Sequence, residues 1–195
     1  MPPLDARTRL WALGTALLCL LPLLPQLPLA LALGTPVVLL AVAALSWRGP
    51  LPAWARAALA VLVVGGVMSA MQFSVGRDTG CALLAAMLAI KPSETATLRD
   101  ARSLVGFALF APFATFLLDQ GPLSLALGLS SALAALVTLQ RLSDLESQAP
   151  TATIPLGARM GSVLRLVALG LPLAMAAFWL FPRLASPLWG VPERA

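Results

Sequence analysis

The chain has 195 residues, of which 59% are hydrophobic and only 11% are charged. Soluble domains carry about 25% charged residues, and no soluble core of this length could enclose so much apolar surface. The composition therefore excludes an ordinary soluble domain and predicts a polytopic membrane protein. The net charge of +5 comes from cations spread singly between apolar runs, which is typical of topology signals and argues against nucleic-acid binding.

The residue types favour helices over a β-barrel. Leu and Ala dominate the sequence, whereas barrel strands would alternate apolar and polar residues. A membrane-spanning helix needs about 20 residues, which leaves room for roughly six or seven spans. We therefore expect an all-α bundle of about seven transmembrane helices over residues 1–182.

The first two spans are expected at residues 10–24 and 29–47. Three prolines, Pro22, Pro25 and Pro28, separate them, and proline removes backbone donors and resists helix continuation. We predict a tight turn near Pro25 and Gln26. The first run is short for a span, so one long kinked span with a half-span over residues 10–47 stays open as the alternative.

The third span is expected at residues 57–73, with Gly65 and Gly66 in its middle. Glycine in a membrane helix most often allows a close contact between helices, and a hinge is the alternative.

The fourth span, residues 76–90, is expected to be unusually short. Its uncharged part, residues 79–90, is only about 18 Å long as a helix. Either the charged residues at its start, Arg77 and Asp78, are buried against other parts of the protein, or neighbouring helices shield the whole segment from lipid. Small residues spaced four apart, Ala82 with Ala86 and Ala85 with Ala89, offer faces for close packing.

The later elements are predicted from capping, turn and hydropathy signals. Thr97 and Asp100 have the spacing of a capping box, and Pro112 should kink the span after it. A polar, Pro-punctuated stretch at residues 143–157 is the longest connection. The last three spans are expected at residues 103–118, 123–142 and 160–180.

The distribution of cations predicts the orientation. If successive loops alternate sides and the N-terminus is inside, ten cations lie inside and three outside, a strong positive-inside bias. The inside group is Arg7, Arg9, Arg48, Arg56, Lys91, Arg99, Arg102, Arg141, Arg159 and Arg165, and the outside group is Arg77, Arg183 and Arg194. The C-terminal segment 183–195 would then lie outside as a Pro-rich connector, and we expect that it once led into a further domain.

The sequence offers no catalytic set. It contains no His and no Tyr, which removes the commonest metal ligand and general base. Cys19 and Cys81 lie in apolar runs and are expected to be small packing residues. We predict no cofactor and no metal. The candidates for structural or partner-contact roles are charged and polar residues at the ends of apolar runs: Arg77, Asp78, Lys91, Glu94, Arg99, Asp100, Asp119 and Gln120.

Residues 76–121 resemble one family. The stretch contains Arg77-Asp78-Thr79-Gly80, a helix ending at Lys91 with Glu94 after it, Arg99-Asp100, and an apolar run from Phe113 to Gln120. Together these resemble the N-terminal transmembrane domain of bacterial TgpA-type membrane-anchored transglutaminase-like proteins. In that family a Leu-Lys-Leu-Leu-Glu-like helix end precedes Arg-Asp and a helix ending in Phe-Leu-x-x-Gln. Pro92-Ser93 departs from the apolar family pattern, which leaves the exact helix end undetermined.

The resemblance implies a location and a role. In such proteins the membrane domain lies in the bacterial inner membrane and precedes a periplasmic domain with a Cys-His-Asp set, which has no counterpart in this sequence. We therefore expect an anchor or scaffold whose partners are the lipid bilayer and a periplasmic transglutaminase-like domain or cell-envelope protein. A transporter or channel subunit for small solutes or lipids is the alternative, although the ionisable residues sit at run ends, where snorkelling explains them.

Overall fold

The computed structural model describes residues 4–146 and 155–180, and every regular element within these ranges is helical. The all-α prediction is therefore confirmed. The chain divides into two compact units, Met1–Ile154 and Pro155–Ala195.

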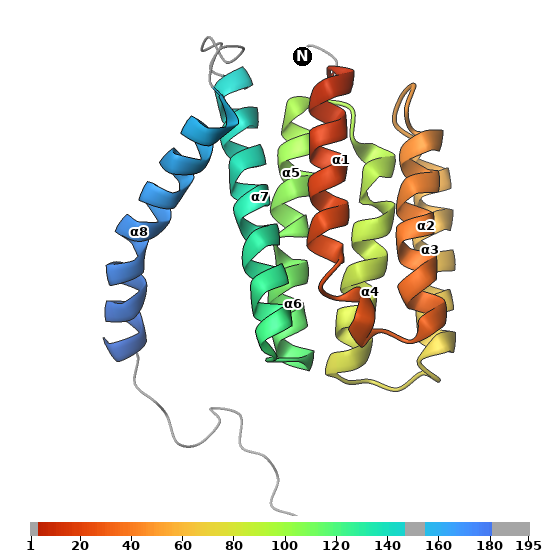
Figure 1. Ribbon diagram of the computed structural model, residues 1–195. Helices are drawn as coiled ribbons and strands as arrows, with labels where there is room; N and C mark the ends of the chain where they lie inside the picture. The colour runs from red at the N-terminus through yellow and green to blue at the C-terminus, as the bar shows by residue number, and fades with distance from the viewer. Residues whose placement is uncertain (1–3, 147–154, 181–195) are drawn as a thin grey trace, which may run out of the picture. The chain divides into compact units, whose positions relative to one another are not determined.

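The first unit is an antiparallel bundle of helices (Figure 1). Helices α1 to α4 alternate in direction, α5 and α6 continue one another as an interrupted segment, and α7 returns (Figure 1). The elements are α1 (Ala6–Leu20), the 3₁₀ helix η1 (Leu24–Gln26), α2 (Leu29–Leu45), α3 (Ala53–Ala70), α4 (Arg77–Ile90), the 3₁₀ helix η2 (Lys91–Glu94), α5 (Leu98–Ala108), α6 (Phe110–Leu118) and α7 (Pro122–Glu146).

Five helical segments of the described chain are long and apolar enough to cross a membrane. Helix α2 is apolar but has only 17 residues, and α4 has 14. The five segments are Ala6–Gln26, Ala53–Ala70, Leu98–Leu118, Pro122–Glu146 and Leu156–Leu180.

The proline-rich turn after the first helix is where the sequence predicted it. Helix η1 contains Pro25 and Gln26, and it separates α1 from α2. The two helices run in opposite directions (Figure 1). Residues 10–47 thus form two helices, whereas the choice between two spans and one long kinked span with a half-span stays a prediction, since only Ala6–Gln26 of this region is long enough to count as a candidate span.

Two further local predictions are confirmed between η2 and α6. The Thr97 Oγ1 atom accepts a hydrogen bond from the Asp100 amide at 3.3 Å, and the Asp100 carboxylate accepts one from the Thr97 amide at 2.9 Å, which completes a capping box. Because the cap lies at Thr97, α5 begins at Leu98, five residues before the predicted start.

The second prediction is the break near Pro112. Pro112 cannot donate to the carbonyl four residues earlier, and the helix is interrupted at Leu109, between α5 and α6.

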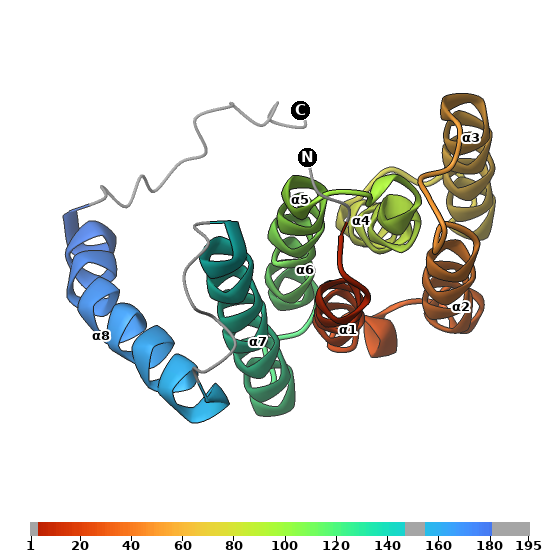
Figure 2. The same ribbon diagram turned by 90° about the horizontal axis from the view of Figure 1, so that it is seen from above.

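Helix α4 lies at the centre of the bundle (Figure 2). It packs against α2, α3, α5 and α6, so the expectation that neighbouring helices shield this short segment is confirmed. The four alanines singled out in the sequence, Ala82, Ala85, Ala86 and Ala89, are all buried. Small side chains let helix backbones approach closely, which is how membrane helices gain packing contacts.

Both cysteines are free and buried, as predicted. The Cys19 thiol on α1 lies 3.6 Å from the Ser131 carbonyl on α7, and the Cys81 thiol on α4 lies 3.6 Å from the Ala114 carbonyl on α6. Each one therefore packs at a helix–helix contact.

The expected close contact at Gly65 and Gly66 is not found. A Cβ atom built on either residue would meet nothing within 4 Å, because this face of α3 is open. Helix α3 occupies the edge of the bundle and packs mainly on α4 (Figure 2). Its exposed side chains include Trp54, Val61 and Leu62.

The second unit contains helix α8 (Leu156–Leu180), which continues through Pro172. It begins four residues before the predicted start of the last span, and α7 continues to Glu146, four residues past its predicted end. The predicted loop at 143–157 is therefore shorter, and its middle, residues 147–154, lies outside the described residues. So does the predicted connector at 183–195.

Candidate functional site

One end of the first unit gathers polar contacts that join several of its helices. We call it the η2 end: it comprises the start of α1, the α2–α3 connection (residues 46–52), η2 and the start of α5, and it lies uppermost in Figure 1. The opposite end comprises η1, the α3–α4 connection and the α6–α7 connection.

Arg9 and Ser46 join three elements at the η2 end. The Arg9 guanidinium on α1 donates hydrogen bonds to the carbonyls of Ser46 and Trp47 after α2, the latter at 2.7 Å, and it stacks over the Trp47 ring, 5.2 Å from the centroid. The Ser46 hydroxyl donates to the Pro92 carbonyl in η2 at 3.1 Å. A cation beside the last carbonyls of a helix satisfies acceptors that have no intrahelical donor. Arg9 thus caps α2 from a different helix.

Backbone hydrogen bonds reinforce the same end. The Leu51 amide donates to the Ser93 carbonyl at 2.8 Å, and the Leu4 amide donates to the Ala96 carbonyl at 3.2 Å. The segments before α1, after α2 and after α4 are therefore held together by main-chain as well as side-chain contacts.

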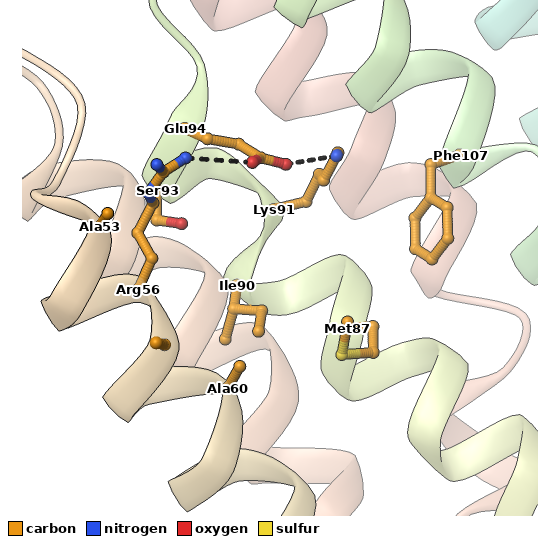
Figure 3. A pocket seen from close by; sticks show the side chains of 10 residues that line it. Ala53, Arg56, Ala60, Met87, Ile90, Lys91, Ser93, Glu94 and Phe107 are labelled. Atoms are coloured by element: carbon orange, nitrogen blue, oxygen red, sulfur yellow. Dashed lines mark hydrogen bonds and ion pairs between the residues drawn. The ribbon is translucent and has the colours of Figure 1, made fainter.

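A small ion cluster surrounds Glu94. Arg56 on α3 donates to one Glu94 oxygen at 3.2 Å, and Lys91 pairs with the other oxygen. The cluster lies at a pocket of about 350 Å³ whose walls come from α3, α4, η2 and α5 (Figure 3). Both Lys91 and Glu94 were predicted from sequence as candidates, and the structure brings them together.

The start of α5 holds the other predicted residues of this end. Asp100 is the capping-box carboxylate, and it also accepts from the Ala96 amide at 3.1 Å. Arg99 is exposed. Arg102, one turn further on, pairs with Glu146 at the end of α7.

The other four predicted residues lie at the opposite end and do not form one cluster with these. Arg77 and Asp78 form an exposed ion pair at the start of α4, 3.6 Å apart. Asp119 accepts hydrogen bonds from the Ser124 hydroxyl and, at 3.2 Å, from the Gly121 amide, so it organises the α6–α7 turn. Gln120 is exposed in that turn.

The cations of the first unit are distributed unequally between its two ends. Arg77 is the only Lys or Arg of the described first unit at the opposite end. Eight others lie toward the η2 end: Arg7, Arg9, Arg48, Arg56, Lys91, Arg99, Arg102 and Arg141. The described residues contain no group of three His, Cys, Asp or Glu that could hold a metal ion.

Comparison with known proteins places this bundle in a family. The family model described as the TgpA N-terminal domain matches residues 11–195. The chain belongs to the TgpA N-terminal domain family. It is 35% identical over 193 residues to a protein-glutamine gamma-glutamyltransferase of Pseudomonas aeruginosa, and the match covers 93% of this chain and 27% of that protein. The resemblance stated from residues 76–121 is therefore confirmed. No solved structure gives a significant match.

Three residues that organise this TgpA N-terminal domain were not among the sequence candidates. They are Arg9 and Ser46, which contact each other across 37 positions, and Arg56, which contacts Glu94 across 38 positions. Contacts between residues so far apart in the sequence cannot be predicted from local sequence patterns. The available signal was weak: Arg9 and Trp47 stand at the start and end of neighbouring apolar runs, where an antiparallel pair of helices would bring them together.

Proposed function

We propose that this chain is the membrane-anchoring domain of a transglutaminase-like protein in the bacterial inner membrane, and that it positions a periplasmic domain. The observation that carries the proposal is the family membership, together with the 35% identity to a protein-glutamine gamma-glutamyltransferase. The chain spans only about a quarter of that relative's length. Residues 1–182 would form the membrane part, and residues 183–195 would connect it to the external domain.

The contacts at the η2 end support six membrane crossings by the first unit. If α2 remained on one side, residues 46–52 would lie across the membrane from the start of α1, and Arg9 could not reach Ser46 and Trp47. If α4 remained on one side, the Leu51 amide could not reach the Ser93 carbonyl. These contacts support a path in which each of the two short helices would return the chain to the side on which it began.

The lengths of the short helices are compatible with this. Helix α2 has 17 residues, about 26 Å at 1.5 Å per residue. Helix α4 with its 3₁₀ extension η2 reaches about 29 Å by the same kind of count. Both values approach the roughly 30 Å thickness of the hydrocarbon layer. Adding α8 gives seven crossings.

The cation distribution supports the orientation. Lys and Arg accumulate on the cytoplasmic side of membrane proteins, and they accumulate at the η2 end here. The η2 end would then face the cytoplasm. After an odd number of crossings the connector would face the periplasm, where the external domain would be held.

A reporter fused after Ala195 tests the anchoring role. We expect an alkaline phosphatase fusion to be active and to stay in the membrane fraction after alkaline carbonate extraction, while the matched β-galactosidase fusion is inactive. Release of the phosphatase into the soluble fraction would refute anchoring, and an active galactosidase with silent phosphatase would refute the periplasmic placement.

A further inference from the structure

The pocket beside the Glu94 cluster has two chemically different parts. Its lower wall is apolar and is formed by Ala57 and Ala60 on α3, Met87 and Ile90 on α4, and Phe107 on α5. Its upper rim carries Arg56, Lys91, Ser93 and Glu94 (Figure 3). The volume of about 350 Å³ lies within the range of roughly 300–1,000 Å³ that is usual for ligand pockets.

The rim carries a net positive charge and retains hydrogen-bonding capacity. Glu94 supplies one carboxylate against the two cations Arg56 and Lys91. A guanidinium has five N–H donors, and Arg56 uses one on Glu94, while its Nε atom has no partner in the described structure. The Ser93 side chain faces the pocket beside them (Figure 3). This rim is suited to an anionic group with several acceptor oxygens.

The position of the pocket identifies the source of such an anion. The pocket lies at the level where α3 begins and α4 ends, and its apolar wall continues from there along α3 and α4 toward the middle of the bundle. Apart from Ser69 near its far end, the exposed side chains of α3 are apolar, and Trp54, 76% exposed, stands in its first turn. An exposed tryptophan at a helix end is typical of the headgroup level of a membrane.

We propose that this pocket binds an anionic phospholipid. The phosphate lies against Arg56 and Lys91, and the upper part of one acyl chain runs down the apolar wall past Ala60 and Met87. Basic pockets between membrane helices take anionic headgroups in this way. Every residue of the pocket belongs to the first unit, so the proposal does not rest on the presence of an external domain.

Native mass spectrometry of the purified chain in detergent tests the proposal. The probes are phosphatidylglycerol, phosphatidylcholine with the same acyl chains, and glycerol phosphate, which has the anionic group without the chains. We expect phosphatidylglycerol to be retained in preference to phosphatidylcholine, and an excess of glycerol phosphate to leave it bound. Equal retention of both lipids, or displacement by glycerol phosphate at the concentration at which phosphatidylglycerol itself competes, would overturn the proposal.

Variants distinguish binding of phosphatidylglycerol in this pocket from a general attraction of the lipid to positively charged surface residues. Arg56→Gln and Lys91→Gln should each weaken phosphatidylglycerol binding roughly fivefold, as expected for the loss of one cation at the membrane surface. Arg77→Gln, the same change at the opposite end, should not weaken it. Ala60→Phe fills the apolar wall and keeps every charge, and it should also weaken binding. Equal effects of Arg56→Gln and Arg77→Gln, or unchanged binding by Ala60→Phe, would overturn the proposal. If Arg56→Gln does not fold, Lys91→Gln decides.

Discussion

Arg9 illustrates how one side chain determines the arrangement of several helices. Its guanidinium supplies hydrogen-bond donors that the end of α2 lacks within its own helix. Its partner Ser46 is fully buried, and the Ser46 hydroxyl donates a hydrogen bond to the Pro92 carbonyl in η2. Buried acceptors that lose their donor are costly because no water replaces it. The side chain therefore contributes by satisfying carbonyls rather than by pairing charges.

Replacing Arg9 with Ala should lower the free energy of unfolding by about 1–3 kcal/mol, because hydrogen bonds from a charged donor at a buried helix end are lost. The Trp47 carbonyl would lose its Arg9 donor, and the Ser46 carbonyl would keep only its bond from the Gly49 amide. Arg99→Ala removes the same type of side chain from an exposed position and should have a much smaller effect. Thermal unfolding in detergent, followed by tryptophan fluorescence, measures both. Equal losses in the two variants would contradict the capping role of Arg9.

At the scale of single helices, close packing depends on glycine in one place and not in another. A Cβ atom at Gly128 on α7 would lie 2.8 Å from the Phe116 ring on α6. At Gly65 on α3 the same atom would meet nothing within 4 Å. Gly128 therefore permits a contact that a larger residue would obstruct.

Gly128→Val should destabilise the bundle by about 1–3 kcal/mol, because overpacking forces side chains and backbone to move. Gly65→Val makes the same substitution on the open face of α3 and should leave stability almost unchanged. The unfolding temperature of each variant in one detergent measures the difference. A larger loss for Gly65→Val than for Gly128→Val would contradict the open face of α3 and the close contact at Gly128.

Local signals predicted the elements better than the contacts between them. The turn at Pro25, the capping box at Thr97 and the break before Pro112 each arise from the chemistry of a few adjacent residues, and each is present. The hydrogen bonds from Arg9 to Ser46 and from Arg56 to Glu94 depend on which helices pack next to one another. The role expected for Gly65 was wrong for the same reason: it required knowing that α3 lies at the edge of the bundle.

At the scale of the whole molecule, the polar contacts and the cations coincide at one end. The residues that hold α1, α2, α4 and α5 together lie among eight of the nine cations of the described first unit. A cation at a headgroup interface is retained where it can stay hydrated or paired. One end would thus serve both to fix the helix ends and to set the orientation in the membrane.

The central claim is that the short helices α2 and α4 cross the membrane and that the η2 end faces the cytoplasm. Single cysteines introduced as Gly49→Cys at the η2 end and Gly76→Cys at the opposite end test it, with the native chain and its buried Cys19 and Cys81 as background. We predict that a membrane-impermeant maleimide added to intact spheroplasts labels Gly76→Cys and labels Gly49→Cys only after lysis. Labelling of Gly49→Cys but not Gly76→Cys before lysis would contradict the account.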